Sequence, residues 1–182
     1  MRLFVAVDID DNLRRSITPL LKLLSSFKGI KAVEPENLHM TLKFLGEVDE
    51  LKAGKIKREL EKIDFSPFEM EFSGIGFFPS SNYMRVIWIG TKGEGIYKLA
   101  DEVEKGMKKL GFKKDRDFKA HLTVGRVKRI DPSSKSKLVK ELEGYDRGYG
   151  KMLVKNFKLK KSTLTPKGPI YDDVAVYGER NE

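Results

Sequence analysis

The stretch HMTLKFLG, residues 39–46, returns in closely similar form as HLTVGRV, residues 121–127. The chain holds only two histidines among its 182 residues, and each precedes a threonine by two positions inside an apolar segment. Side chains two apart in a strand share a face, so His39 lies beside Thr41 and His121 beside Thr123. The repeated frame predicts two equivalent strands, each presenting an imidazole and a hydroxyl.

The similarity extends along the chain when the numbering is shifted by 82. The shift places residues of the same kind opposite each other in helices, strands and loops, namely Gly29 and Gly111, Asp49 and Asp131, Lys55 and Lys137, Leu60 and Leu142, and Val5 and Ile87. Such agreement favours two copies of one strand-helix-strand-helix-strand unit. We predict a single bilobal domain over residues 1–182, with an internal repeat of approximately residues 1–82 and 83–178.

Hydrophobic periodicity predicts an alternation of strands and helices. The expected strands are 2–8, 68–78 and 84–90, and the expected helices are 11–28, with Gly29 as its stop, and 50–62. Two copies indicate an α+β fold with two pseudo-twofold-related lobes, each an antiparallel sheet backed by helices, and a central cleft. Both histidine strands line that cleft if the lobes face each other.

Composition narrows the class of protein. The net charge of +9 and the pI near 9.5 favour a polyanionic partner such as nucleic acid. Cysteine is absent, which excludes disulfides and thiolate chemistry. The longest apolar run, residues 3–7, is too short for a membrane span and lacks a cleavage site, so we expect a cytoplasmic protein. Abundant Lys, Glu and Arg without glutamine is typical of thermophiles.

Two imidazoles in one cleft suit simultaneous proton removal and proton donation. Their ordinary pKa lies near 6.5, so at neutral pH one ring of a pair can be protonated while the other is neutral. Hydrolysis of a phosphodiester without a metal or cofactor needs this combination. A metal site of His39 and His121 with Glu34, Glu36 or Asp117 is the weaker alternative, since none of these shares a helical ligand spacing with a histidine.

Cationic side chains near the two motifs are candidates to bind a phosphate group. Arg126 has the planar fork that suits phosphate, but strand alternation puts it on the face opposite His121 unless the strand bends at Gly125. Lys43 shares the alternation of His39 and Thr41, and it is therefore a second candidate. Tyr83 and Arg85 are further candidates for contact with a base or phosphate, with a surface location as the alternative.

The two motifs and their flanks resemble the 2H phosphoesterase superfamily, and especially its RNA 2′,3′-cyclic phosphodiesterase branch, also called 2′-5′ RNA ligases. The resemblance covers most of the chain, and it rests on the stretches MRLFVA (1–6), PENLHMTLKFLG (35–46), RVIW (85–88), HLTVGR (121–126) and STLTPKGPIY (162–171). It implies a bilobal α+β fold and metal-independent hydrolysis of RNA 2′,3′-cyclic phosphate ends to 2′-phosphate. The RNA partners it implies include tRNA halves, and the reverse reaction is 2′-5′ ligation.

The same resemblance assigns roles to residues of this chain. It implies that His39 donates a proton to the leaving 3′-oxygen and that His121 accepts one from water. Thr41, Thr123 and Arg126 then bind the phosphate.

Two further functions remain open from the sequence: a basic RNA-binding module without significant catalysis, and a cyclic phosphodiesterase that acts on small nucleotides. Nothing in the sequence indicates oligomers, so we expect a monomer.

Overall fold

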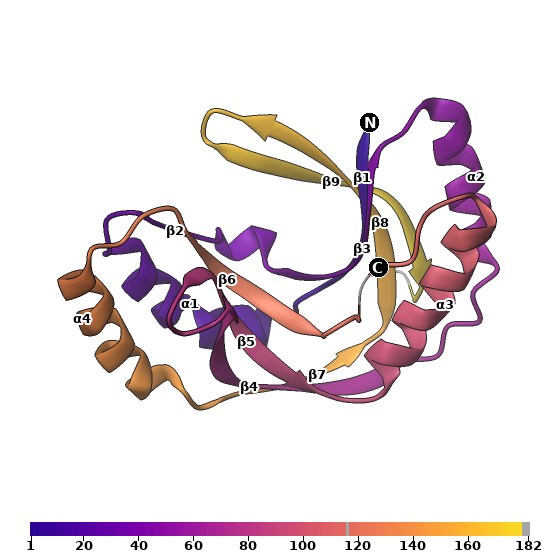
Figure 1. Cartoon of the computed structure of the whole chain (residues 1–182). Helices are drawn as coiled ribbons and strands as arrows, with labels where there is room; N and C mark the ends of the chain where they lie inside the picture. The colour runs from indigo at the N-terminus through magenta and orange to yellow at the C-terminus, as the bar shows by residue number, and fades with distance from the viewer. Residues whose placement is uncertain (116, 180–182) are drawn as a thin grey trace.

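The computed structural model describes residues 1–115 and 117–179 and shows two antiparallel sheets with helices beside each (Figure 1). Within these residues the chain forms nine strands and four α-helices. The strands are β1 (Arg2–Asp8), β2 (Ile30–Ala32), β3 (His39–Glu47), β4 (Phe68–Pro79), β5 (Met84–Lys92), β6 (His121–Val127), β7 (Gly148–Val154), β8 (Asn156–Thr165) and β9 (Gly168–Gly178). The helices are α1 (Asp11–Ser25), α2 (Glu50–Glu61), α3 (Gly95–Lys109) and α4 (Pro132–Leu142).

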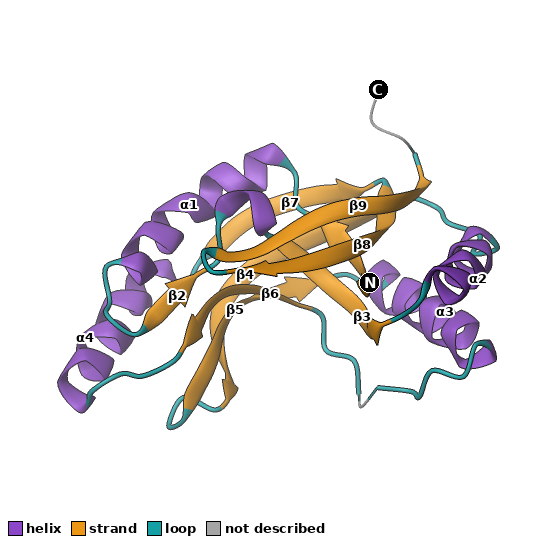
Figure 2. Ribbon diagram, turned by 90° about the horizontal axis from the view of Figure 1, so that it is seen from above, coloured by secondary structure: helices purple, strands orange, loops and turns teal. Residues whose placement is uncertain are grey.

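Each sheet forms one lobe. The first sheet has the strand order β3-β1-β8-β9, and α2 and α3 lie beside it. The second has the order β2-β6-β5-β4-β7, and α1 and α4 lie beside it. Figure 2 shows the two pairs of helices at opposite ends of the molecule, with the strands between them. The prediction of an α+β fold with two lobes is confirmed.

Neither lobe consists of one predicted repeat. The first sheet combines β1 and β3 with β8 and β9, while helix α1 from the beginning of the chain packs on β2, β6 and β7 of the other lobe. The lobes thus exchange segments, and a single break in the chain does not separate them. The internal repeat itself stays a prediction. Its shift of 82 places β1 opposite β5 and β3 opposite β6, and each of these pairs is adjacent in its own sheet, β1 with β3 and β5 with β6.

The core lies between each sheet and its helices. Ile17 of α1 and Val103 of α3 are fully buried, as are Ile87 of β5 and Leu122 of β6. Burying an aliphatic side chain of this size contributes about 1.5–3 kcal/mol relative to leaving it exposed. The apolar residues that alternate with the histidines therefore pack in the core, and the histidine face of each strand points to the space between the lobes.

Helix α1 ends three residues before the predicted end at residue 28. Its last turn closes at Ser26, whose backbone N–H donates to the carbonyl of Leu23, and the N–H of Phe27 donates to that of Leu24. The chain then reverses through Gly29, which has φ of +86°. Gly111, its equivalent after α3, has φ of +89°. The paired glycines mark the left-handed turns that follow two helices, and such turns favour glycine.

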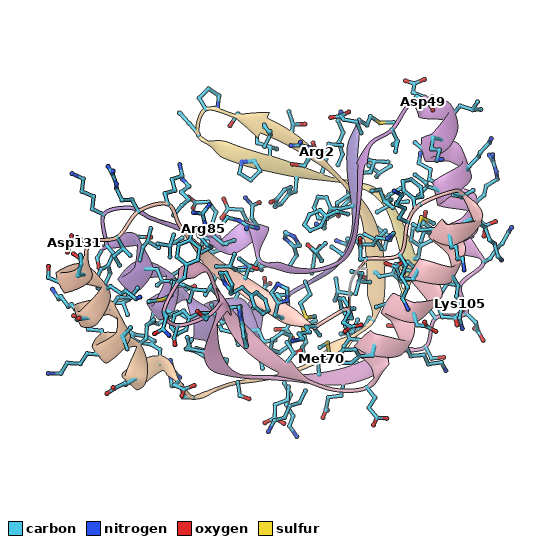
Figure 3. The ribbon with its side chains drawn as sticks, in the orientation of Figure 1. Arg2, Asp49, Met70, Arg85, Lys105 and Asp131 are labelled. Carbon is cyan, nitrogen blue, oxygen red and sulfur yellow. The ribbon has the colours of Figure 1, made fainter. Side chains whose placement is uncertain are left out.

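Helices α2 and α4 begin in the same way at opposite ends of the molecule, as the labelled Asp49 and Asp131 show in Figure 3. The Asp49 carboxylate accepts a hydrogen bond from the backbone N–H of Lys52, and Asp131 accepts one from Ser134. The bond from the Ser134 backbone, with those from the hydroxyls of Ser133 and Ser134, lowers the pKa of Asp131 to about 2. An aspartate at this position satisfies a free N–H of the first turn.

Candidate active site

Both histidine strands contain a β-bulge at the same place, one residue after the threonine. In β3, Thr41 pairs with Ala6 of β1, but the next residue of β1, Val5, pairs with Lys43. Leu42 is therefore the extra residue, and the side-chain alternation reverses after it. Burial follows the reversal, because Leu42 and Lys43 are both buried and Phe44 is exposed.

Strand β6 repeats this bulge against β5. Thr123 pairs with Trp88 and Gly125 with Ile87, so Val124 is the extra residue. Val124 and Gly125 are both buried, and Arg126 is exposed. The bulge turns Arg126 to the face of His121 and Thr123, where simple alternation would have placed it opposite. The bend near Gly125 that the sequence required for Arg126 to reach the site is thus present.

The ring orientation of His39 is fixed at both nitrogens. Nδ1 lies 2.6 Å from the carbonyl oxygen of Asn37, and Nε2 lies 3.0 Å from Oγ1 of Thr41. A carbonyl only accepts hydrogen bonds, so Nδ1 carries the hydrogen and Nε2 of the neutral ring accepts from the Thr41 hydroxyl. The rings of Phe4 and Tyr171 lie 5.2 and 5.1 Å from the imidazole, centroid to centroid. His39 is held in one orientation, with Nε2 as its reactive atom.

His121 is held in the equivalent way. Its Nδ1 lies 2.7 Å from the carbonyl oxygen of Lys119, two residues earlier, as Asn37 is two residues before His39. Phe78 flanks this ring edge-on with the centroids 5.0 Å apart, and Trp88 lies 6.4 Å away. The carbonyl again assigns the hydrogen to Nδ1, which leaves Nε2 free to exchange a proton with a substrate.

A cavity of about 730 Å³ brings the two motifs together. Its lining includes His39, Thr41, His121, Thr123 and Arg126. A volume in this range suits a ligand the size of a nucleotide. The cavity therefore places two imidazoles, two hydroxyls and a guanidinium around one opening between the lobes.

Burial and neighbouring charges change the pKa of His39. Burial is the largest influence, and it lowers the pKa of His39 below the ordinary 6.5. The hydrogen bond to the Asn37 carbonyl and the charge of Asp8 raise this pKa, whereas the charges of Lys160 and Arg126 lower it. Arg126 lines the same cavity as His39 and Thr41, so its guanidinium faces the first motif as well as the second.

Lys43 does not share the face of His39 and Thr41, so this expectation is wrong. Although Lys43 borders the cavity, its side chain is only 1% exposed, and the bulge directs it toward α3. Nζ lies 2.9 Å from Oε1 of Glu104, 2.9 Å from the Lys113 carbonyl oxygen and 3.2 Å from Oδ2 of Asp115. The ammonium is fully engaged, and it anchors the segment that leads to His121.

Tyr83 and Arg85 lie outside the cavity lining, so the structure places neither beside the paired histidines. The Arg85 guanidinium donates a hydrogen bond to the Tyr83 hydroxyl at 3.1 Å and stacks 5.7 Å from that ring. Both side chains are exposed beside the turn between β4 and β5, where Figure 3 labels Arg85. Of the two interpretations of these residues, the surface location describes their position.

Several aromatic residues line the cavity that the sequence patterns did not indicate: Phe4, Phe44, Phe78, Phe118 and Tyr171. Phe44 could have been found, because the shift of 82 places it opposite Arg126. Phe118 lies only three residues before His121. Phe4, Phe78 and Tyr171 lie far along the chain from the motif that they contact, and only the sheet pairing brings them together.

Metal binding and membrane insertion each require a recognisable arrangement of residues. Among residues 1–115 and 117–179, no group of three or more His, Cys, Asp or Glu side chains is arranged to hold a metal ion. None of the helices in the described part of the chain is long and apolar enough to cross a membrane.

The sequence model of LigT-like phosphoesterases matches the chain twice, over residues 7–88 and 89–171. This chain belongs to the LigT-like phosphoesterase family. An RNA 2′,3′-cyclic phosphodiesterase of Archaeoglobus fulgidus is 53% identical over 178 residues, which cover 97% of this chain and 99% of the relative. One of Methanocaldococcus jannaschii is 47% identical over 175 residues, covering 94% of this chain and 97% of the relative.

The fold of this LigT-like phosphoesterase is similar to that of a solved protein. The crystal structure of TT0787 of Thermus thermophilus superimposes with a TM-score of 0.83 at 28% identity, covering 98% of this chain and 97% of that one. The similarity supports the two-lobed arrangement. Family membership makes the chain an enzyme, a phosphoesterase.

Proposed function

We propose that this chain hydrolyses RNA 2′,3′-cyclic phosphate ends to 2′-phosphates, with His39 as the proton donor and His121 as the proton acceptor. One observation carries the proposal: both imidazoles are fixed through Nδ1 by the carbonyl two residues earlier, and both line the same cavity. The two archaeal relatives are named RNA 2′,3′-cyclic phosphodiesterases, which supports the choice of substrate.

The reaction is one displacement at phosphorus. Water attacks the phosphorus atom and gives a proton to Nε2 of His121. The bond between phosphorus and the 3′-oxygen breaks, and that oxygen takes the proton from Nε2 of protonated His39. The sum is one water consumed and one 2′-phosphate monoester formed. Each well-placed acid or base contributes roughly 10²–10⁴-fold in rate, so no metal ion is needed for the proton transfers.

Thr41, Thr123 and Arg126 are placed to bind the phosphate. Hydroxyls donate to the non-bridging oxygens, and a guanidinium presents two N–H groups to them. Arg126 stabilises the negative charge that develops as water attacks. Phe44, exposed at 68% on the cavity face of β3, offers an aromatic ring to a base of the RNA.

Several finer points belong to the same proposal. Run in reverse, with a 5′-hydroxyl in place of the water and the proton roles exchanged, the cleft would join RNA ends through a 2′-5′ bond. Its RNA substrates include tRNA halves, and the charge of +9 favours RNA over a free nucleotide. We propose that the enzyme works as a monomer in the cytoplasm.

The decisive experiment uses a 2′,3′-cyclic nucleotide and a short RNA with a 2′,3′-cyclic end, both in the presence of EDTA. We expect a 2′-phosphate from each, and a loss of roughly 10²–10⁴-fold for His39→Ala and for His121→Ala. Tyr83→Ala, an exposed change outside the cavity, is the matched control. Normal turnover by His39→Ala, or activity that EDTA abolishes, would contradict the mechanism.

The same substrates separate the alternative functions. A preference for the RNA over the cyclic nucleotide supports an RNA enzyme, and equal rates support an enzyme of small nucleotides. RNA binding that ignores the cyclic end and yields no product would identify a basic binding module. A 3′-phosphate product would show that the 2′-oxygen is the leaving group in place of the 3′-oxygen.

A further inference from the structure

Four charged side chains form a closed group on the first sheet. Lys160 of β8 lies 2.8 Å from Oδ1 of Asp8 and 3.0 Å from Oδ1 of Asp173. Lys158, two residues earlier, lies 2.8 Å from Oδ2 of Asp8 and 2.9 Å from Oδ2 of Asp173. Each ammonium therefore contacts both carboxylates. We name these residues the ion quartet.

The ion quartet lies on the face of its sheet that carries His39 and Phe4, and its two lysines are largely removed from water. The side chains of Lys158 and Lys160 are 13% and 10% exposed, and those of Asp8 and Asp173 are 29% and 40% exposed. Lys160 pairs with Phe4 across β1 and β8, and the Phe4 ring contacts His39. Charges shielded from solvent act on their neighbours more strongly than surface charges do.

Asp8 is the cross-strand partner of His39. The equivalent partner of His121 is Gly90, which the shift of 82 places opposite Asp8. A Cβ atom at Gly90 would lie 2.8 Å from the carbonyl oxygen of Ser73, so a larger side chain does not fit there. The two histidines thus share a frame but differ at this position, since a carboxylate stands beside only one of them.

The charged groups facing His39 come from three strands. The charge of Asp8 on β1 raises the pKa of His39, and the charges of Lys160 on β8 and Arg126 on β6 lower it. Tyr171 of β9 also contacts the ring, and burial raises the pKa of its hydroxyl, so it stays neutral. Asp173 pairs with Lys160 and Lys158 pairs with Ala6, so neither is the cross-strand partner of His39 or of Phe4, whose ring contacts His39.

We propose that Asp8 and Lys160 are positioning residues that set the protonation of His39, and that Lys158 and Asp173 hold them in place. The inference rests on the proposed role of His39 as proton donor. A proton donor must be protonated before the reaction. Burial and the positive charge of Arg126 disfavour the protonated ring of His39, whereas the negative charge of Asp8 favours it. Lys160 limits this effect, which keeps the proton transferable.

Nuclear magnetic resonance can test the proposal without turnover, because the protein has only two histidines. The ring carbon shifts of labelled histidine are followed against pH, and His121→Asn assigns the remaining signal to His39. Asp8→Asn should move the His39 midpoint to lower pH, and Lys160→Met should move it to higher pH. The two shifts have opposite signs because the removed charges do.

Asp173→Asn and Lys158→Met are the matched controls. Each breaks two ion pairs of the same quartet at nearly the same distances, so each perturbs packing comparably. Both should move the His39 midpoint less than the Asp8 and Lys160 variants do. If Asp8→Asn does not fold, the comparison of Lys160→Met with Lys158→Met remains decisive, because the first should raise the midpoint more than the second.

Shifts of the same sign for Asp8→Asn and Lys160→Met, or controls that shift as much as they do, would overturn the inference. That failure is separate from failure of the proposed function. Hydrolysis by the unchanged enzyme tests the proposed function. The titration midpoints of His39 test the effect of the ion quartet even if no product forms.

Discussion

Strands β3 and β6 share the same arrangement of histidine, threonine and bulge, but the residues that follow the bulge differ. In both, a histidine is fixed through Nδ1 by the carbonyl two residues earlier, a threonine follows, and a bulge then reverses the side-chain alternation. Beyond the bulge, β3 has Lys43 and Phe44 where β6 has Gly125 and Arg126. The geometry of the reacting groups is shared, and the residues around it are not.

The residues that follow the two bulges are suited to different parts of a substrate. Arg126 brings a charge suited to phosphate, and Phe44, at the equivalent position, brings a ring suited to a base. Lys43 extends toward α3 to bind Glu104, whereas Gly125 leaves room for Leu24 of α1, whose Cδ1 would lie 3.1 Å from a Cβ atom there. Under the proposed function, β3 would contact the nucleoside side of the substrate and β6 its phosphate.

The largest effect is expected where the two bulges differ in packing. Lys43→Met leaves Glu104 without its buried partner, and loss of one member of a buried pair costs about 3–5 kcal/mol of unfolding free energy. For a chain of this length the melting temperature should fall by roughly 10 °C. Lys55→Met on the exposed face of α2 is the control, with a change within about 0.5 kcal/mol. Equal melting temperatures of the two variants would show that Lys43 is no anchor.

The next largest effect tests the charge on β6. Arg126→Met should reduce kcat by about 10²–10³-fold, because it removes a donor aimed at the developing negative charge. Steady-state hydrolysis of a cyclic nucleotide measures it. Arg85→Met removes the same charge outside the cavity and should leave kcat unchanged. A variant at Arg126 with normal kcat would exclude the guanidinium from the reaction.

Much of this comparison could be predicted from the sequence. The frame of His39 and Thr41 repeats at His121 and Thr123, and alternation alone places each imidazole beside its hydroxyl. The bulges could not be predicted, because one extra residue in a ladder depends on the partner strand. The extra residue Leu42 reversed the face of Lys43 in β3, and the extra residue Val124 supplied the bend that Arg126 required in β6.

Contacts between distant segments were also beyond prediction. Asp8 and Lys160 meet because β1 pairs with β8, and nothing in the local sequence of either strand indicates that pairing. Tyr171 reaches His39 in the same way, from β9. Local periodicity determines which face a side chain takes, whereas strand order determines which faces meet.

A smaller effect is expected at Phe44. Stacking of a base on an aromatic ring contributes about 1–3 kcal/mol, so Phe44→Ala should reduce kcat/KM for an RNA end by roughly 5- to 150-fold. The reduction should appear mainly in KM, and Phe44→Tyr should retain activity because its ring still stacks. Tyr83→Ala, an exposed ring outside the cavity, is the control. A fall in kcat alone would place Phe44 in the chemistry and not in base binding.

The smallest effect is a displacement of the pH profile, and it tests whether the histidine of β3 titrates in the reaction. Burial lowers the pKa of His39 below its ordinary 6.5, and a proton donor at His39 loses its proton as pH rises through the lowered pKa. Lys160→Met removes a charge that lowers this pKa, so one limb of the kcat/KM profile should move to higher pH while the other stays. A profile with neither limb displaced would show that the charge of Lys160 does not act on the reaction through His39.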